Sequence, residues 1–349
     1  MNPYIELFRG IAALMVMMCH YAPILVEGER GWLNFLWTGV DFFFVISGFV
    51  FAPHIFRGKI APLGFFVRRF FRIYPLYFLS VGLYFVLTPD VPEKIGYLLS
   101  HLGMLHTIHS RAEAFFFNPA YWSLPPEVEF YLLLPLLSLW VNSSRKLVTL
   151  ALLALAMHIV LYVNAQANPT AGLIYIMGVH LPGLLIEFLV GVLAFRFSQR
   201  QPIPFLYAVL LLAISAGMLI WLGQHFVRFG EAGIYDNPIL RTSFNLLCAV
   251  AYAIILCVTV NLAAGRITNS KWAALCMLAG QSSYGVYLFH NAIPIMFAGM
   301  SISPMQRFVL YGFVTVLLAI ALNRLYEGPL HRYGVALSNR MDKMQNRNT

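Results

Sequence analysis

A few ionisable side chains lie inside long apolar stretches of the sequence, and these are the residues that could do chemistry. They are Arg9, His20, Asp41, Glu187 and His290. An ionisable group in hydrocarbon costs roughly 3 kcal/mol or more, so such residues mark a functional site by default, with structural ion pairing as the alternative. An imidazole titrates near neutral pH and can take a proton from a hydroxyl group, whereas an arginine keeps a fixed positive charge. The set therefore favours proton transfer by a histidine.

The spacing of Arg9 and His20 suggests how the two could act together. They are eleven positions apart in one apolar stretch, which is close to three full helical turns. Such a helix places both side chains on one face, roughly 16 Å apart along its axis. It would present a guanidinium group toward one membrane surface and a titratable base toward the other. The alternative interpretation makes Arg9 an interfacial anchor and His20 a hydrogen-bonded histidine of a helix bundle.

Membrane helices must position these residues. The chain has 349 residues, of which 60% are hydrophobic and 11% charged, and its mean hydropathy is +0.74. Water-soluble domains carry roughly 25% charged residues, so this composition excludes a soluble globule. We predict an all-α polytopic bundle of about ten transmembrane helices. The predicted spans lie near residues 5–26, 35–56, 73–88, 126–141, 147–163, 172–195, 204–224, 239–263, 272–298 and 304–324.

The net charge of +9 is explained by topology and not by nucleic-acid binding. With a cytoplasmic N-terminus, most arginines and lysines fall in cytoplasmic connections and most acidic residues fall outside, as the positive-inside rule requires. Both termini are then cytoplasmic. We expect one transmembrane domain over residues 1–335 and a polar, basic cytoplasmic tail over residues 336–349. The longest connection, residues 91–120, has the mixed pattern of a surface or re-entrant helix.

No metal site is predicted. His101, His106 and His109 match no standard zinc spacing and are interpreted as interfacial residues. The four cysteines all lie in apolar stretches and form no C-x-x-C pair, so they are interpreted as small buried hydrophobic residues. We also expect no permanently bound cofactor.

Six short sequence blocks follow one another along the chain. They are Arg9 with His20 after ten intervening residues, Gly39–Phe49, the R-x-x-R-I-x-P block Arg69–Pro75, the W-S-L block with Glu127 at Trp122–Tyr131, the E-F-x-x-G block Glu187–Gly191, and Ser283–His290. In this order they resemble the motifs of the acyltransferase-3 family of integral-membrane enzymes, over nearly the whole chain. Two blocks depart from the family pattern: Pro125 and Pro126 precede the glutamate, and Pro182-Gly183 stands where members often carry an arginine.

The resemblance implies a ten-helix enzyme of the plasma membrane, or bacterial inner membrane, without an appended extracytoplasmic domain. It implies acetyl-CoA or another acyl-CoA as co-substrate. It also implies an extracytoplasmic hydroxyl group as acceptor, commonly on a surface glycan.

The motifs and the residue chemistry together suggest the catalytic roles. His20 is the expected general base, with Asp41 or Glu127 as the carboxylate that would orient its ring. Transfer through an acyl-histidine is the less favoured route. Glu127 could instead act structurally, as a first-turn carboxylate that the helix dipole favours. Ser47-Gly48 is expected to let two helices approach closely.

The donor and acceptor ends are predicted separately. A basic loop from Arg57 to Arg72 is expected to bind the phosphates of acyl-CoA, since guanidinium groups suit phosphate oxygens, or else to contact lipid headgroups. The residues expected to bind the donor are Arg9, Arg68, Arg69 and Arg72. The residues expected to line the acceptor passage, or else to hydrogen-bond across helices, are Tyr284, Tyr287 and His290.

Two other functions fit parts of the pattern. Intramembrane arginine, histidine and glutamate residues also line transport pathways, so the main alternative is a transporter or flippase for an anionic or glycan-linked substrate. No pair of symmetric broken helices indicates one. An inactive relative that serves as a scaffold is disfavoured by the presence of Arg9, His20 and Glu127. Release of free CoA would distinguish the enzyme from a transporter.

Overall fold

The computed structural model describes residues 2–25, 31–56, 58, 60–165, 172–263 and 270–345. Within these residues every regular element is helical, which confirms the predicted all-α class. The physical reason is that a backbone in hydrocarbon must satisfy its own hydrogen bonds, and a helix does so within one segment.

The long helices coincide with the ten predicted spans. They are α1 (Pro3–Leu25), α3 (Gly39–Phe56), α4 (Pro62–Leu87), α7 (Leu124–Trp140), α8 (Ser144–Ala165), α10 (Leu181–Ser198), α11 (Phe205–Tyr235), α12 (Pro238–Leu262), α13 (Ser270–Phe289) and α15 (Pro304–Leu322). The shorter elements are α2 (Trp32–Phe35), η1 (Leu36–Thr38), α5 (Lys94–Leu102), α6 (Arg111–Ala114), η2 (Pro119–Ser123), α9 (Gly172–Val179), α14 (Ala292–Met296) and η3 (Asn323–Glu327), and α16 (Gly328–Gln345) follows.

Eight helices of the described chain are long and apolar enough to cross a membrane, so the protein is a multi-pass integral membrane protein. The predicted spans at residues 126–141 and 272–298 are helical but fall outside these eight. The first corresponds to α7, which has 17 residues. A helix of that length reaches about 25 Å, somewhat less than the roughly 30 Å of a bilayer core. Large apolar side chains remain exposed on α8, α11 and α15, including Leu152, Leu206 and Phe313, as a lipid-facing surface requires.

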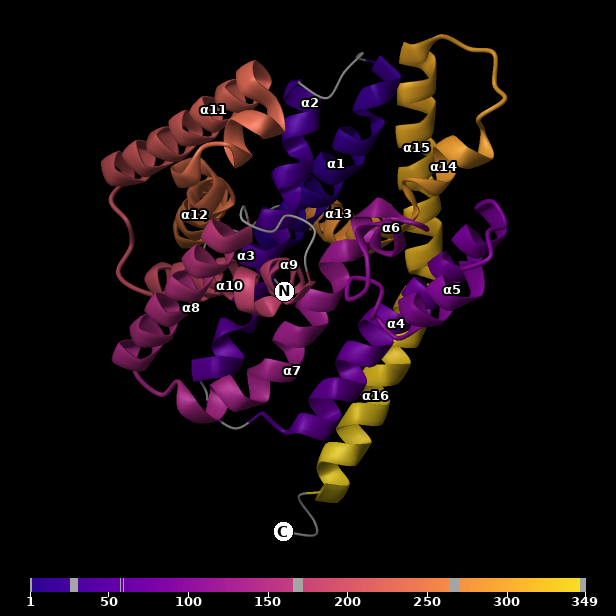
Figure 1. The fold of residues 1–349 in the computed structure, drawn as a ribbon. Coiled ribbons are helices and arrows are strands. Elements are labelled where there is room, and N and C mark those ends of the chain that lie inside the picture. The colour runs from indigo at the N-terminus through magenta and orange to yellow at the C-terminus, as the bar shows by residue number, and fades with distance from the viewer. Residues whose placement is uncertain are drawn as a thin grey trace.

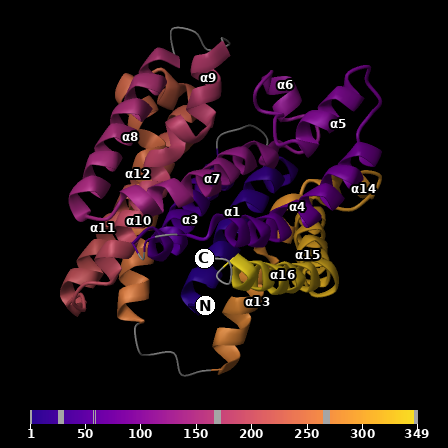
Figure 2. The same cartoon turned by 90° about the horizontal axis from the view of Figure 1, so that it is seen from below.

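Helix α4 differs from the prediction. It begins at Pro62, so Arg68, Arg69 and Arg72 lie on a helix and the predicted basic loop is wrong for them. Arg57 and Lys59 lie outside the described residues. A loop is predicted because these arginines interrupt the apolar pattern of the sequence. In the structure they lie on a helix, where aromatic rings and acidic side chains contact them. Residues 336–345, predicted as a tail, continue α16, which runs beside α4 (Figures 1 and 2).

Glycines set the closest helix contacts around the centre of the bundle. A Cβ atom at Gly48 would lie 1.8 Å from the carbonyl oxygen of Phe188, and one at Gly191 would lie 2.0 Å from that of Val45. Helices α3 and α10 therefore pack backbone to backbone, which confirms the close approach predicted at Ser47-Gly48. Helix α1 packs most extensively on α13, and Gly10 contacts Ala279 there.

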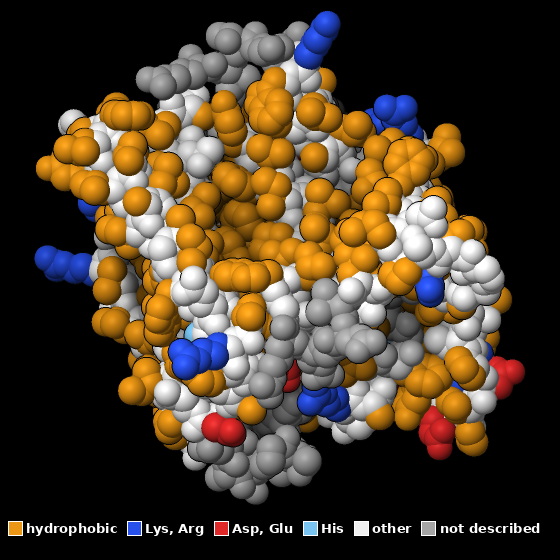
Figure 3. All heavy atoms as spheres, turned by 90° about the horizontal axis from the view of Figure 1, so that it is seen from above, with side chains coloured by type: hydrophobic (Ala, Val, Ile, Leu, Met, Phe, Trp, Pro, Cys, Tyr) orange, Lys and Arg blue, Asp and Glu red, His pale blue; other side chains and the backbone are white. Residues whose placement is uncertain are grey.

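The end of the molecule at the top of Figure 1 is largely apolar. Figure 3 looks down on it and shows a hollow lined by hydrophobic side chains, with charged side chains scattered around the hollow and along the edge of the view. The connection between α4 and α7 forms α5, α6 and η2, which is consistent with the mixed pattern of residues 91–120.

Candidate active site

His20 on α1 contacts His290, the residue that follows α13. The Nδ1 atom of His20 lies 2.9 Å from Nε2 of His290, and the two rings stack with centroids 4.9 Å apart. Nδ1 of His290 lies 3.0 Å from the carbonyl oxygen of Val286. A carbonyl only accepts, so His290 carries its proton on Nδ1 and accepts with Nε2. His20 must then donate through Nδ1, which leaves its Nε2 lone pair available as a base.

The position of His290 is fixed by hydrogen bonds to its backbone and to its neighbours. The Tyr21 hydroxyl donates to the His290 carbonyl oxygen at 2.6 Å and lies 2.8 Å from the hydroxyl of Thr315 on α15. The Asn291 amide donates to Asn118 at 2.8 Å. His290 itself is fully buried. The histidine pair is therefore held between α1, α13, α15 and the η2 segment.

The two predicted carboxylates lie elsewhere. Asn245 of α12 donates to Asp41 at 3.1 Å, and Glu187 is the other close neighbour of Asp41. Glu127 accepts from the hydroxyls of Tyr131 and of Ser47, the latter at 3.2 Å. In the described part of the chain the His20 ring contacts His290 and the backbone of Val16, and it bonds to neither carboxylate.

The four arginines predicted to bind the donor do come together. Arg69 lies near enough to Arg9, Arg68 and Arg72 for their charges to repel its own. Its guanidinium carbon lies 5.1 Å from the centre of the Phe51 ring and 5.8 Å from that of Tyr131. The Nε atom of Arg69 is buried and has no hydrogen-bond partner among the described residues. We refer to Arg9, Arg68, Arg69 and Arg72 as the arginine cluster.

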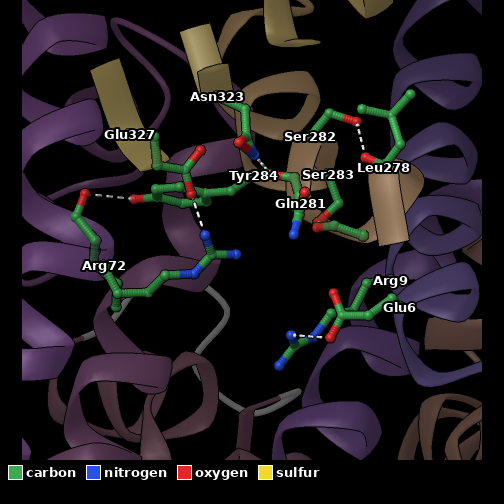
Figure 4. A network of polar contacts seen from close by, with 12 residues as sticks. Glu6, Arg9, Arg72, Leu278, Gln281, Ser282, Ser283, Tyr284, Asn323 and Glu327 are labelled. Atoms are coloured by element: carbon green, nitrogen blue, oxygen red, sulfur yellow. Dashed lines mark hydrogen bonds and ion pairs between the residues drawn. The ribbon is translucent and has the colours of Figure 1, made fainter. Parts of the chain in front are cut away.

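Three members of the arginine cluster are held by acidic partners. Arg9 pairs with Glu6 at 3.0 Å, Arg68 with Asp342 at 3.3 Å, and Arg72 with the buried Glu327. In Figure 4 the guanidinium groups of Arg9 and Arg72 point toward the same open space. Partners on α1, η3 and α16 thus hold these arginines in place, while Arg69 is held by aromatic rings. Such a cluster suits a ligand with several anionic oxygens.

The two tyrosines of α13 are bonded to backbone. The Tyr284 hydroxyl donates to the Ile73 carbonyl at 3.1 Å, and the Tyr284 ring lies 5.9 Å from the guanidinium carbon of Arg72. The Tyr287 hydroxyl donates to the Ala120 carbonyl at 2.6 Å. Both contacts agree with the alternative to an acceptor passage, in which these tyrosines form hydrogen bonds between helices. Tyr284 also lies beside the arginine cluster.

A pocket of about 720 Å³ opens beside His20. Aromatic side chains form much of its wall, and Arg241 and Asn245 of α12 also line it. Arg241 is only 6% exposed. Arg241 is not among the site residues predicted from the sequence. It could have been, because it is an ionisable residue inside the predicted span 239–263, just as Arg9 is inside the first span.

Of the three histidines predicted to be interfacial in the connection between α4 and α7, His101 and His106 are buried inside the protein and His109 is exposed. The rings of His101 and His106 stack with centroids 4.2 Å apart. Burial lowers the pKa of His101 to about 3 and that of His106 to about 4. Among the described residues no group of His, Cys, Asp or Glu side chains has the arrangement of a metal site. The pair is therefore a neutral part of the packing.

Comparison with known proteins identifies the family. The model of the acyltransferase domain family matches residues 2–324. The "Exopolysaccharide production protein ExoZ" of Rhizobium meliloti (strain 1021) is 28% identical over 313 residues, which cover 86% of this chain and 90% of that protein. The "Putative acetyltransferase ORF330" of Acidianus two-tailed virus is 22% identical, with 96% and 92% of the two chains covered. No solved structure matches the chain. The chain belongs to the acyltransferase-3 family and is an acyltransferase.

Proposed function

We propose that the protein is an O-acyltransferase of the bacterial inner membrane that acylates a surface glycan. It moves an acyl group, in the simplest case acetyl, from cytoplasmic acyl-CoA to a hydroxyl group outside the membrane. The family membership supports acyl transfer, and the name of the relative ExoZ supports a polysaccharide acceptor. The observation that carries the proposal is the contact of His20 Nδ1 with His290 at the wall of a pocket, which leaves Nε2 of a neutral His20 as the acceptor nitrogen, with no hydrogen-bond partner among the described residues.

The arginine cluster supports an acyl-CoA donor. CoA carries several phosphate groups, and guanidinium groups bind phosphate oxygens strongly. Arg9 occupies the same helix as His20, toward the opposite end, so the donor and the acceptor would approach the reaction from opposite sides. The positive-inside rule assigns the arginine side to the cytoplasm, where acyl-CoA is made.

The reaction then follows from the protonation state of His20. Nε2 takes the proton of the acceptor hydroxyl as its oxygen attacks the thioester carbonyl carbon, and a new carbon–oxygen bond forms. The carbon–sulfur bond breaks, and the CoA thiolate leaves with the proton from Nε2. His290 accepts a hydrogen bond from Nδ1 throughout, which keeps the ring oriented and stabilises its protonated form.

The test uses purified protein with acetyl-CoA labelled in the acetyl group and a surface-glycan preparation from a strain that lacks the gene. We expect free CoA and labelled glycan from the wild type, and neither from His20→Ala. His225→Ala, a histidine of α11 outside the pocket, is the matched control and should retain activity. Full activity in His20→Ala would exclude this mechanism. Glycan movement without CoA release would indicate a transporter, and label retained on the protein would indicate an acyl-histidine.

A further inference from the structure

Arg241 is a buried cation that has no ion-pair partner among the residues that the structure describes. Only 6% of it is exposed, and in the described part of the chain its Nε and Nη1 atoms have no hydrogen-bond partner. No carboxylate of the described residues forms an ion pair with it, although Glu231 and Asp236 line the same pocket. A buried charge without a partner is strongly destabilising, so such a group is normally paired or hydrogen-bonded.

The helix that carries Arg241 makes this unpaired charge still less favourable. Arg241 lies in the first turns of α12, where the helix dipole is positive and repels a cation. The Asn237 side chain caps the helix by accepting from the backbone amides of Ile239 and Leu240, so it does not compensate Arg241. A negatively charged group in the pocket would satisfy both the guanidinium group and the helix end.

A second unsatisfied donor belongs to Trp37, which also lines the pocket. The indole Nε1 of Trp37 is buried and has no hydrogen-bond partner among the described residues. Trp37 stacks on Phe244 at 6.3 Å between ring centroids, which holds its ring in place. Phe115, Trp122 and Tyr162 add further aromatic walls. Fixed aromatic faces with a few convergent donors are the features that bind a ligand with an apolar C–H face and several oxygen atoms, such as a sugar ring.

The pocket also places this donor set in reach of the proposed base. Asn245 lies one helical turn after Arg241 on the same face of α12, and both line the pocket together with His20. A single ligand can therefore contact Arg241 at one end and His20 at the other. The binding group and the reacting group would belong to one molecule.

We infer that the pocket binds the acceptor and that Arg241 recognises a carboxylate on it, so the acceptor is an acidic glycan. The inference rests on the proposed function and specifies its substrate class. Arg241 and Trp37 would donate to the carboxylate of an acidic sugar, the aromatic walls would contact the sugar ring, and the hydroxyl to be acylated would lie at Nε2 of His20.

The binding test uses the full-length purified protein and three probes: trigalacturonate, its neutral methyl ester, and glucose 1-phosphate. Quenching of tryptophan fluorescence reports binding. We expect the wild type to bind trigalacturonate about tenfold more tightly than the ester, as a charge-assisted hydrogen bond in a buried site allows. Equal affinity for the two would overturn the inference. Tighter binding of glucose 1-phosphate than of trigalacturonate would also overturn it, because the site would then recognise phosphate.

Variants assign any preference to Arg241. Arg241→Gln should bind the acid and the ester equally, and Arg241→Lys should keep part of the preference because it keeps the charge. Arg228→Gln is the matched control, since Arg228 is an exposed arginine of α11 that does not line the pocket. We expect Arg241→Gln to fold, because it removes a buried charge that has no ion-pair partner among the described residues. An unchanged preference in folded Arg241→Gln would overturn the inference, and if that variant does not fold, a preference unchanged in Arg241→Lys would do so.

The binding test and the activity test fail independently. His20→Ala should lose acyl transfer and keep the preference for trigalacturonate over its ester. If the wild type bound trigalacturonate more tightly than its ester but released no CoA, the proposed function would be contradicted, whereas the inferred anion site would be supported. Equal acylation of acidic and neutral glycans, with no effect of Arg241→Gln, would contradict the inference and leave the function standing.

Discussion

Nδ1 of His20 lies 2.9 Å from Nε2 of His290, and the second nitrogen of His290 lies 3.0 Å from the carbonyl oxygen of Val286. This chain of contacts fixes the proton position on both rings, because it begins at a group that can only accept. In a Ser-His-Asp triad a carboxylate orients the catalytic imidazole. Here a histidine does so, and when the His20 ring is neutral its single proton lies on Nδ1, which leaves Nε2 to accept the proton of the acceptor hydroxyl.

His290 is accordingly a positioning residue, and its replacement should affect turnover more than donor binding. His290→Phe keeps a buried ring but removes the acceptor, so His20 can adopt the unproductive tautomer. We expect kcat to fall about a hundredfold, within the range that general-base catalysis contributes, with little change in the KM for acyl-CoA. His290→Gln offers an amide oxygen to Nδ1 of His20 and should recover much of the loss. Steady-state kinetics on the three proteins measure this, and equal losses in both variants would argue for a purely structural His290.

The donor role of the arginine cluster can be separated from folding by changing the substrate. Arg69→Gln removes the guanidinium group that rests on Phe51 and Tyr131. We expect its KM for acetyl-CoA to rise about tenfold or more, as the loss of a charge-assisted hydrogen bond predicts. Acetyl-pantetheine lacks the nucleotide phosphates, so its much weaker reaction should be the same in the wild type and the variant.

Arg196→Gln is the matched control for the donor test. Arg196 is an exposed arginine of α10 that stacks on Phe56 and lies outside the cluster. Its KM for acetyl-CoA should stay unchanged. If Arg69→Gln weakened acetyl-pantetheine and acetyl-CoA by the same factor, Arg69 would not contact the phosphates.

Hydropathy and the motif blocks predict most of the fold and the identity of several site residues, but not their partners. Apolar length alone locates the helices, since hydrocarbon forces each segment to satisfy its own backbone. The partner of His20 lies 270 positions away, and helix packing alone decides that His290 and not Asp41 reaches it. Hydropathy does not predict that α4 begins at Pro62, because the arginines of its first turns lower the local hydropathy. In the structure aromatic rings and acidic residues stabilise these charges.

The stacked pair His101 and His106 should make stability depend on pH. The pKa values of the two folded side chains lie near 3 and 4, below their ordinary value of 6.5. The unfolded chain therefore binds protons that the folded chain does not, and the free energy of unfolding falls as the pH drops from about 6.5 to 4. The slope for two histidines is at most about 2.7 kcal/mol per pH unit.

Melting temperatures of the purified protein between pH 7 and pH 4 measure this dependence. Replacing both residues, as in His101→Gln with His106→Gln, should make the curve clearly flatter, whatever its effect at pH 7. His109→Gln is the control, because it removes an exposed imidazole of the same connection that contacts Glu113 at 3.3 Å, and it should not flatten the curve. Identical curves for the double variant and the wild type would show that the pair is not buried as neutral rings.

The contact between α3 and α10 should tolerate no side chain at Gly48. A Cβ atom there would lie 1.8 Å from the backbone oxygen of Phe188, and backbone cannot move aside as a flexible side chain can. Helix α3 also carries Asp41 and Ser47, so separating the helices would disturb the residues around the site. We expect Gly48→Ala to abolish folding into a monodisperse protein, as size-exclusion chromatography of the solubilised protein would show. Gly82→Ala on α4 is the control: a Cβ there meets nothing within 4 Å, and alanine favours a helix by about 1 kcal/mol over glycine. If both variants eluted as folded protein in equal yield, the two backbones could not be in the contact described.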